Sequence, residues 1–363
     1  MNELSKTLSL IKKYCAREAT PPILQNVLMG LKDGMMTLAT TNLEAWVSTS
    51  FPCTGNPFSA TVSLEKLEKA TKNMTDPLDF TVTVSKLIVS DGKTRVALIT
   101  IPVEEFPPKP EAEELLGELD LDGIERVCSF AHTETDRSSV LTYVLLEVEG
   151  GKTKLVACDG FKLAFLERTS NLPDMKLLMP ARALSNIPKG YTKAELFSGK
   201  ECATLDFGGF VLTVRTLEHT YPNYNQVIPV SYNSKLIVNV KEWLDVIKSI
   251  KVFSDETSGI VRHSVTDNAM IVSAQDEDGN VIERAINVEV DQLSPVFVIN
   301  DKQLTTTLKA CSGNDITVKL TMSEDPTTLS ETIPNIPTRK ALVFEDGTDW
   351  KAVVMPMHLI KDW

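Results

Sequence analysis

A layout that repeats at a fixed period is the feature that most constrains the fold of this chain. Cap-like residues predict helix starts near Asn2, Ser63, Asp120, Pro180, Asn239 and Asn300. Alternate members of this series recur at roughly 117–120 residues, which is the length of one small domain. A β-rich segment lies between the two predicted helices of each copy, at 23–47, 140–165 and 260–288. The layout therefore indicates three copies of one domain.

Local sequence chemistry supports both kinds of element. Asn239 and Asn300 are followed three residues later by Glu242 and Gln303, which is the spacing of a helix capping box. The segments LKDGMMTLA, VEGGKTKLVA and VSDGKTRVALI place Asp-Gly or Gly-Gly between alternating stretches, as β-hairpins do. We expect an α+β protein in which two helices pack on antiparallel sheet, three times over.

The composition is that of a soluble globular protein, with 42% hydrophobic and 24% charged residues among 363. No apolar run reaches the ~18 residues of a membrane span. The six cysteines form no Cys-x-x-Cys pair, so we expect a reduced, cytoplasmic protein.

The net charge of −12 argues at first against nucleic acid, but the charge is unevenly distributed. The six predicted helices, 2–18, 63–74, 120–132, 180–193, 239–252 and 300–311, sum to +6 and leave −18 for the rest. In the 239–252 helix the lysines lie off the apolar stripe. One basic surface on an acidic protein is thus predicted, although a charged face on a single helix is more often simply solvated.

Enzyme signatures are missing from the sequence. It contains no phosphate-binding loop of the GxxxxGK[ST] type, no GxGxxG, no GxSxG and no HExxH. Cys128 and His132 stand four residues apart but would need further ligands to hold a metal. The segment DEDGN at 276–280 is more typical of a hairpin turn than of a calcium loop. We expect no catalytic residue, no metal and no cofactor.

Five segments, in this order and at these separations, carry a resemblance to a known family. They are PILQNVL at 22–28, IPVEEFP at 101–107, ACDGFKLA at 157–164, YPNYNQVIP at 221–229 and VVMPMHL at 353–359. Together they closely resemble the bacterial replicative sliding clamp, the β subunit of DNA polymerase III. The similarity spans nearly the whole chain and agrees with the threefold repeat.

The resemblance implies three tandem copies of the DNA-clamp fold, at 1–112, 113–230 and 231–363, and a head-to-tail homodimer that closes a six-domain ring around duplex DNA. Helices that line the hole would offer cations to phosphates without reading bases. The basic residues expected there are Lys12, Lys13, Arg17, Lys66, Lys69, Lys72, Arg126, Arg182, Lys189, Lys193, Lys241, Lys248, Lys251, Lys302 and Lys309.

The resemblance also implies two protein-binding surfaces. A groove between the second and third domains would receive short apolar peptides from the replicative polymerase, the clamp loader and other partners. Its expected residues are Leu141, Cys158, Gly160, Phe161, Lys162, Leu163, Pro222, Gln226, Val227, Val343, Val353, Val354, Met355, Pro356 and Met357. Phe106, Val252 and Phe253 match the apolar positions that close the dimer.

The chain departs from its family at several of these positions. It has Gln226 where Arg is common, Phe161 where His is usual and His358 where Arg is frequent, and residues 360–363 extend beyond the usual end. Ser139 and Val140 replace an aromatic pair. Peptide specificity and DNA contact in the second domain therefore stay open, as do the host and a cellular, phage or plasmid origin.

Three functions remain in competition at this point. The leading hypothesis is a non-enzymatic homodimeric sliding clamp. The second is a clamp-fold protein that does not encircle DNA and acts as a peptide-binding decoy or regulator, which the altered groove and the C-terminal extension motivate. An enzyme is third, because no catalytic set is present. A ring requires a dimer, so the oligomeric state separates the first two.

Overall fold

The computed structural model describes residues 2–16, 21–133, 139–253, 259–291, 295–321 and 340–357. The chain divides into two compact units. Unit 1 comprises residues 1–123, 148–151 and 170–218, and unit 2 comprises residues 124–147, 152–169 and 219–363. Elements of the middle repeat fall in both units.

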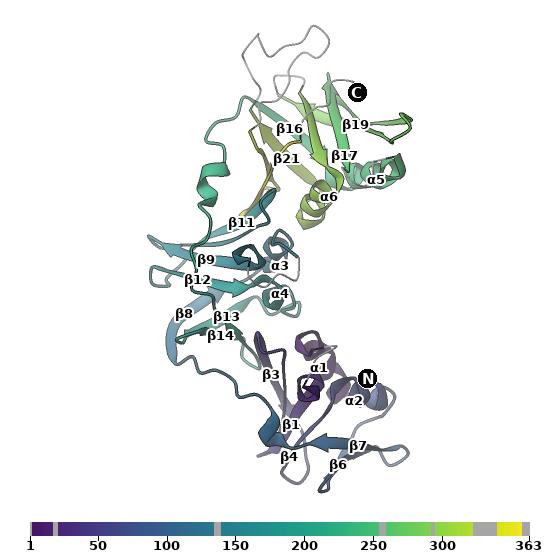
Figure 1. The fold of residues 1–363 in the computed structure, drawn as a ribbon, viewed down its shortest axis with the longest axis vertical. Helices are drawn as coiled ribbons and strands as arrows, with labels where there is room; N and C mark the ends of the chain where they lie inside the picture. Colours follow the sequence, from purple (N-terminus) through teal and green to yellow (C-terminus); the bar gives the residue numbers. More distant parts are fainter. Residues whose placement is uncertain are drawn as a thin grey trace. The chain divides into compact units, whose positions relative to one another are not determined.

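Unit 1 holds the first repeat and part of the second (Figure 1). Its helical elements are α1 (Glu3–Ile11), η1 (Lys12–Tyr14), η2 (Pro22–Gln25), α2 (Leu64–Thr71), η3 (Val103–Glu105) and α4 (Ala181–Leu184). Its strands are β1 (Asn26–Lys32), β2 (Met35–Thr41), β3 (Ala45–Pro52), β4 (Phe58–Ser63), β5 (Asp79–Val82), β6 (Lys86–Ser90), β7 (Arg95–Ile101), β8 (Glu114–Asp120), β12 (Met175–Pro180), β13 (Lys193–Ser198), β14 (Cys202–Asp206) and β15 (Phe210–Arg215). One antiparallel sheet runs in the order β5-β6-β7-β4-β1-β2-β3-β15-β14-β13-β8.

Unit 2 holds the other part of the second repeat and the third. Its helical elements are α3 (Ile124–Cys128), η4 (Val140–Thr142), η5 (Tyr224–Val227), α5 (Val240–Ile250), η6 (Lys251–Phe253) and α6 (Asp301–Ala310). Its strands are β9 (Tyr143–Glu149), β10 (Lys152–Cys158), β11 (Lys162–Thr169), β16 (Ser234–Asn239), β17 (Ile260–Thr266), β18 (Ala269–Gln275), β19 (Val281–Val290), β20 (Val296–Asn300), β21 (Asp315–Leu320), β22 (Leu342–Glu345) and β23 (Trp350–Val354). They follow one another as β9-β10-β11-β23-β22-β21-β16-β19-β18-β17-β20.

The predicted β-rich segments are confirmed as three equivalent meanders, β1-β2-β3, β9-β10-β11 and β17-β18-β19. The predicted hairpin turns are present too. Asp33-Gly34 and Gly150-Gly151 both have two positive φ angles, which suits the twist of a tight hairpin. The DEDGN segment is a turn in which the Asp276 carboxylate accepts from the backbone N–H of Asn280 at 2.8 Å.

The predicted caps hold the helix starts. The Asn2, Asn239 and Asn300 side chains accept from backbone N–H groups of the first turns of α1, α5 and α6, and Ser63 does so for α2. The reciprocal half of the capping box is not seen at α6, where Gln303 Oε1 is buried without a hydrogen-bond partner among the described residues. The cap itself is sufficient to start the helix.

Two predicted helices are much shorter than expected. The 180–193 helix is the four-residue α4, because Pro188 lacks an N–H and Gly190 adopts φ +96°. The 120–132 helix is α3 alone, since Asp120 ends β8 and Gly123 turns the chain with φ +74°. Helix α1 also ends earlier, at Ile11, and continues as η1.

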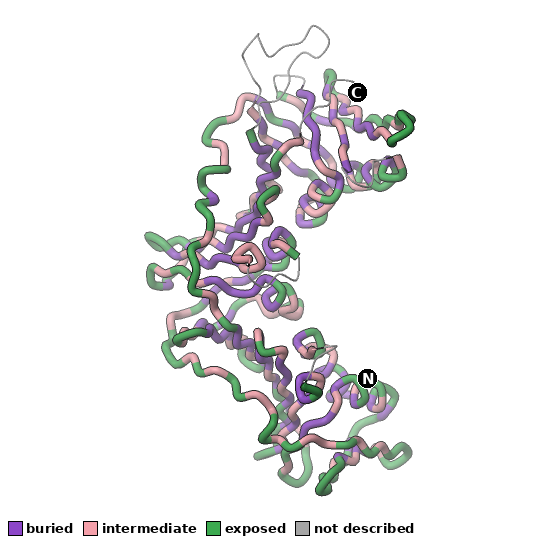
Figure 2. The backbone as a smooth tube through the Cα atoms, in the orientation of Figure 1, coloured by how far each residue is buried: buried purple, intermediate pink, exposed green. Residues whose placement is uncertain are grey.

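In each unit the α-helices lie on one side of the strands (Figure 1). Buried residues run along the strands, and exposed residues concentrate at turns and outer helix faces (Figure 2). Helix α5 buries Val240, Trp243, Ile247 and Ile250, whereas its lysines are exposed, as predicted. Burial of the apolar stripe drives helix docking and leaves the charged face outward.

Candidate functional site

The pairing of β11 with β23 builds the surface on which most of the predicted peptide-binding residues lie. The ladder pairs Lys162 with Val354, and the backbone N–H of Met355 extends it by donating to the carbonyl of Phe161 at 2.9 Å. The N–H of Met357 donates to the carbonyl of Val298 in β20 at 2.8 Å. Phe161 and Met355 are therefore held side by side by main-chain bonds.

Two tyrosines fasten the 221–227 segment to the neighbouring strands. The Tyr221 hydroxyl accepts from the backbone N–H of Cys158 at 3.1 Å, and the Tyr224 hydroxyl donates to the Glu147 carboxylate. Burial raises the pKa of both phenols, so they remain protonated at neutral pH. The YPNY motif therefore positions the loop that carries Gln226 and Val227, a role that the sequence did not reveal.

The predicted peptide-binding residues divide by exposure. Phe161, Val227 and Met355 are exposed apolar side chains, at 65%, 45% and 36%. Leu141, Pro356 and Met357 are half-buried, and Pro222 and Gln226 are exposed. Five others are buried in the core, namely Cys158, Leu163, Val343, Val353 and Val354. Val353 and Val354 are adjacent on β23 and therefore point to opposite faces of the sheet, so both faces are covered there. Contact of a ligand with these five residues stays a prediction.

The turn before β11 is shaped by Gly160, which has φ +94°. Lys162 was expected to face the peptide, but only 9% of its side chain is exposed. Its ammonium donates to the Asp159 carboxylate at 2.8 Å and lies 5.2 Å from the centre of the Phe130 ring. Lys162 thus supports the turn and is not a free cation of the surface.

Arg126 differs most from its predicted role. Its side chain is 13% exposed, pairs with the inaccessible Asp346 carboxylate and donates through Nε to the carbonyl of Ala310 at 2.5 Å. Its guanidinium lies 4.6 Å above the Trp350 ring. Although burial alone would raise the pKa of Asp346, bonds from Thr348 and Ser312 and the Arg126 charge hold it below its usual range. Arg126 therefore stabilises contacts within unit 2, and we remove it from the basic residues expected to contact DNA.

The other described members of the basic set have exposed side chains. Five of them pair with nearby carboxylates: Lys12 with Glu68, Lys69 with Glu65, Lys193 with Glu118, Lys248 with Asp245 and Lys251 with Asp301. The pairs of Lys69, Lys193 and Lys248 are exposed on both sides, and such pairs are weak and leave the cations open to phosphate. Lys251 differs, because its partner Asp301 is buried. Lys13, Lys66, Lys72, Arg182, Lys241, Lys302 and Lys309 lie on or directly after helices and have no ion pair among the described residues.

Two members of that set are not on a helix, contrary to the prediction. Lys189 lies in the turn in which the N–H of Tyr191 donates to the carbonyl of Pro188, and Lys193 begins β13. Arg17, His358 and the 360–363 extension lie outside the described residues. Of the residues expected to close a dimer, Val252 is 84% exposed, and Phe106 and Phe253 are half-buried.

Within the described ranges, no three histidine, cysteine, aspartate or glutamate side chains are grouped closely enough to hold a metal ion. Over the same residues, no helix has the length and apolar character needed to cross a membrane. The six cysteines are free thiols, and burial raises the pKa of Cys128 and Cys158. Their thiols are therefore poor nucleophiles at neutral pH.

Tandem repeats of paired helices on antiparallel sheet, with exposed lysines on the helices, define the class of the DNA clamps. Profiles of the DNA polymerase III β subunit match this chain twice, the N-terminal domain at residues 1–110 and the C-terminal domain at 225–338. The chain belongs to this family, the bacterial β sliding clamps.

Individual relatives agree with that assignment. The β sliding clamp of Synechococcus elongatus is 26% identical over 351 residues, which cover 91% of this chain and 93% of that protein. The clamp of Pseudomonas aeruginosa is 25% identical over 98% of both chains. A crystal structure of a sliding clamp from P. aeruginosa bound to griselimycin superposes with a TM-score of 0.85 at 22% identity, over 98% of this chain and 97% of that one.

Proposed function

We propose that this sliding clamp is a processivity factor that closes head to tail with a second copy around duplex DNA, tethers the replicative polymerase through peptide motifs and catalyses no reaction itself. The cytoplasm, where bacterial replication takes place, would be its location. The observation that supports the proposal is a junction between repeats that is not made within the chain. Two junctions between consecutive repeats are made within the chain, and no described strand covers the edges needed for a third.

The two internal junctions use equivalent strands in equivalent register. At the first, β3 pairs with β15, with Ala45 opposite Val214 and Thr49 opposite Phe210. At the second, β11 pairs with β23, with Lys162 opposite Val354 and Leu166 opposite Trp350. Each junction thus joins the third meander strand of one repeat to the last strand of the next.

The strands that would make a third junction are β19 and β7. Along 281–287, β19 pairs with β18 on one side, and its ladder with β16 is confined to residues 288–290. Along 95–99, β7 pairs with β6, and its ladder with β4 is confined to residues 100–101. Ile99 and Val281, at these edges, are 75% and 52% exposed. Edges of this kind are templates for pairing with another chain.

The internal registers predict the register between copies. Val211 and Lys351 occupy the position equivalent to Arg95, because each of the three pairs with the last residue of the strand before it. Asn280 occupies the position equivalent to Ala45 and Lys162. The backbone carbonyl of each of these residues accepts the hydrogen bond that closes the turn before its strand. Transferring the pairings places Val281 opposite Ala97 and Glu283 opposite Arg95 of the second copy. Opposite charges facing across a ladder stabilise it.

The helix side supports the same contact. Tyr14 is the third residue of η1 after α1, and its hydroxyl donates to the carbonyl of Ala183 in the next repeat at 3.1 Å. Phe253 is the third residue of η6 after α5. By this equivalence Val252 and Phe253 face the first repeat of the second copy, where burial of their apolar surface favours association.

Charge reversal tests the closing contact. We expect Glu283→Arg or Arg95→Glu alone to give monomers, because like charges would meet across the ladder, and the double variant to restore the dimer, as measured by sedimentation velocity. Glu289→Arg is the matched control, since Glu289 lies on the part of β19 that pairs with β16. A dimer that survives both single reversals would refute this register. Wild-type protein that stays monomeric would leave the non-encircling regulator as the function.

Retention on DNA tests encirclement. The protein is acidic and its cations are spread over several helices, so affinity for short linear duplex should be weak and should fall with salt. Protein loaded on closed circular DNA should remain until the circle is cut. Equal retention on circular and linear DNA at the same salt concentration would contradict a ring.

Peptide binding tests the β11–β23 surface. A peptide carrying Gln followed by spaced Leu and Phe should bind through Phe161, Val227, Met355 and Met357. Met357→Ala should weaken binding by about 1–3 kcal/mol, the range for an apolar hot-spot side chain. Met35→Ala, at an exposed methionine of unit 1, is the matched control. Unchanged affinity of the Met357 variant by calorimetry would remove the assignment.

A further inference from the structure

A pocket of about 430 Å³ lies between the two helices of the third repeat, where the start of α5 meets the end of α6. The N–H of Val240 donates to the carbonyl of Asn314 at 2.8 Å and holds these two ends together. All residues that line the pocket belong to unit 2. Its volume lies within the usual range for sites that bind small molecules.

Three lysines line this pocket and come from both helices. Lys241 and Lys248 are seven residues apart on α5, so they lie two turns apart on one face of that helix. Lys309 comes from the last turn of α6, and all three side chains are exposed. Asp245 also lines the pocket, where its carboxylate accepts from the Lys248 ammonium at 3.0 Å. Three lysines against one aspartate give the lining a net charge of +2, which favours a ligand with several negative charges.

The remaining lining is uncharged. Leu244 lies between the two lysines of α5 and is half-buried, and Leu308 of α6 is 1% exposed. Asn314 is exposed, and its side chain makes no hydrogen bond within the described part of the chain. An amide offers both a donor and an acceptor, which matches the edge of a nucleobase. The pocket thus combines cations with a surface that suits an uncharged ring.

We propose that this pocket binds a nucleoside triphosphate, whose phosphate groups contact the three lysines and whose base packs on Leu244 and pairs with Asn314. Lysine binds phosphate as a compact charge, so cations from two helices suit a chain of phosphates better than a single anion. A fatty acid would bring one charge to three lysines, and an inorganic anion would leave Leu244 without a contact. A nucleoside triphosphate has both the charges and the uncharged body that the lining requires.

A bound nucleotide would also affect contact with DNA. Lys241, Lys248 and Lys309 are among the residues expected to contact DNA, so the phosphates of a nucleotide would neutralise cations that DNA otherwise uses. Nucleotide and duplex should therefore compete for this part of the protein. The competition rests on the proposed function, whereas binding of a nucleotide does not.

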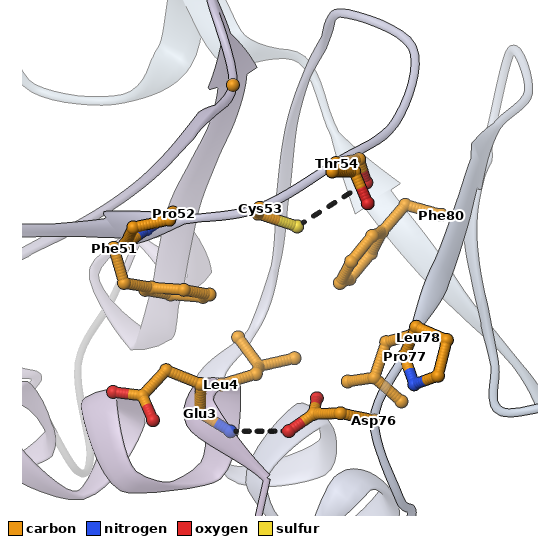
Figure 3. A pocket seen from close by; sticks show the side chains of 11 residues that line it. Glu3, Leu4, Phe51, Pro52, Cys53, Thr54, Asp76, Pro77, Leu78 and Phe80 are labelled. Atoms are coloured by element: carbon orange, nitrogen blue, oxygen red, sulfur yellow. Dashed lines mark hydrogen bonds between the residues drawn. The ribbon is translucent and has the colours of Figure 1, made fainter.

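Two thiols give a matched readout of occupancy. Cys311 lines the α5–α6 pocket, is half-buried and donates to a main-chain carbonyl at 3.6 Å. Figure 3 shows the Cys53 thiol at a pocket of about 340 Å³ in unit 1, where it makes a similar bond at 3.7 Å. Burial raises the pKa of both thiols, that of Cys311 to about 11, so both are alkylated slowly. The charges differ, because the carboxylates of Glu3 and Asp76 line the pocket beside Cys53.

ATP at millimolar concentration should slow alkylation of Cys311 several-fold and leave the rate at Cys53 unchanged, as measured by mass spectrometry of digested protein. Tripolyphosphate and adenosine test the two parts of the ligand separately, and each should protect Cys311 less than ATP does. An unchanged rate at Cys311, or equal slowing of both thiols, would overturn the proposal. Equal protection by tripolyphosphate and ATP would overturn a nucleoside triphosphate as the ligand.

Lys309→Gln tests whether the pocket, and not a general attraction to lysine-rich helices, holds the nucleotide. This variant should weaken ATP binding several-fold in calorimetry, because it removes an exposed cation of the lining without disturbing the core. Lys302→Gln is the matched control, since Lys302 is also exposed on α6 but does not line the pocket. Equal weakening in both variants would mean diffuse attraction and overturn the site. Dimerisation and DNA retention are measured separately, so a failure here leaves the proposed clamp function intact.

Discussion

Each junction between repeats places an arginine over a tryptophan, but the two arginines stand in opposite environments. At the junction in unit 2, the Arg126 side chain is mostly shielded from solvent, lies 4.6 Å from the centre of the Trp350 ring and pairs with the inaccessible carboxylate of Asp346. At the junction in unit 1, Arg215 is exposed, lies 5.5 Å from the centre of the Trp46 ring and donates to the carbonyl of Leu43. The two junctions share the same strand pairing. The arginine that supports it is desolvated in unit 2 and solvated in unit 1.

The helix sides of the junctions differ in the same way. In unit 1, Tyr14 reaches Ala183 with a neutral hydroxyl, and its ring packs 6.2 Å from that of Phe210. In unit 2, the Arg126 guanidinium reaches Ala310, and Arg168 forms a further ion pair with Asp349. The two junctions therefore share a backbone geometry but are stabilised by different kinds of side-chain contact. The ionic junction should be the more sensitive one, because a buried charge that loses its partner is costly.

The largest effect should come from Arg126→Ala. It leaves the inaccessible Asp346 carboxylate without its cation, and loss of one partner of a buried pair costs about 3–5 kcal/mol. Urea unfolding with proteolytic fragments mapped to each unit should show unit 2 destabilised and unit 1 unchanged. Arg182→Ala, at an exposed arginine of α4, should change stability by less than about 0.5 kcal/mol.

A double variant separates charge from packing at that site. Arg126→Met with Asp346→Asn removes both charges while keeping an amide whose single oxygen can accept either from Ser312 or from Thr348. It should recover at least half of the loss seen for Arg126→Ala. If the double variant were no more stable than the single one, the uncompensated charge would not be the cause.

The second largest effect should come from acid pH, which should destabilise unit 2 more than unit 1. Burial lowers the pKa of His263 to about 3, and Trp243 Nε1 donates to its Nε2 at 3.2 Å, so the neutral ring is the folded form. Between pH 6.5 and 3 the unfolded chain binds this proton and the folded chain does not. Unit 2 should therefore lose stability as pH falls, by about 3 kcal/mol at pH 4.5.

Unit 1 is the internal reference for this measurement, because its residues include no histidine. Urea midpoints at pH 7 and pH 4.5 should diverge between the units. His263→Phe should be less stable at pH 7, since Trp243 loses an acceptor, but its pH dependence in this window should be flatter. A variant with the same acid sensitivity as the wild type would remove His263 as the cause.

The features that the sequence predicted are those set by near neighbours. Caps at Asn2, Ser63, Asn239 and Asn300 and the glycine turns of the hairpins depend on a few adjacent residues, and the period of the repeat follows from them. The helix at 180–193 was predicted too long, although Pro188 and Gly190, which follow its observed end at Leu184, are residues that interrupt helices.

The features that were missed depend on distant residues. Arg126 meets Ala310 and Asp346 across 184 and 220 positions, so nothing near it in sequence reveals its burial. Likewise, Val353 and Val354 belong to a motif that we expect at a peptide-binding surface, yet both are buried once β23 pairs with β11.

A smaller effect is expected at the neutral junction of unit 1. Tyr14→Phe keeps the ring against Phe210 and removes one hydrogen bond to the carbonyl of Ala183, which should cost unit 1 about 1–2 kcal/mol. Tyr191→Phe is the matched control, because its ring also packs on Phe210 while no bond of its hydroxyl to the described residues is seen. Equal losses in the two variants would mean that the Tyr14 hydroxyl does not strengthen the junction.

Arg215→Ala should have the smallest effect and completes the comparison. The exposed guanidinium keeps its hydration, so its position over Trp46 is worth about 0.5–1 kcal/mol, the range for solvent-exposed cation–π contacts. No buried carboxylate is left behind, in contrast to Arg126→Ala. The losses in unfolding free energy of the two variants can be measured in the same urea titration. Because both sites share the arginine–tryptophan geometry, the ratio of these losses reports the contribution of burial. If Arg215→Ala destabilised unit 1 by as much as Arg126→Ala destabilises unit 2, the shared stacking would be the dominant interaction, and the distinction between an ionic and a neutral junction would fail.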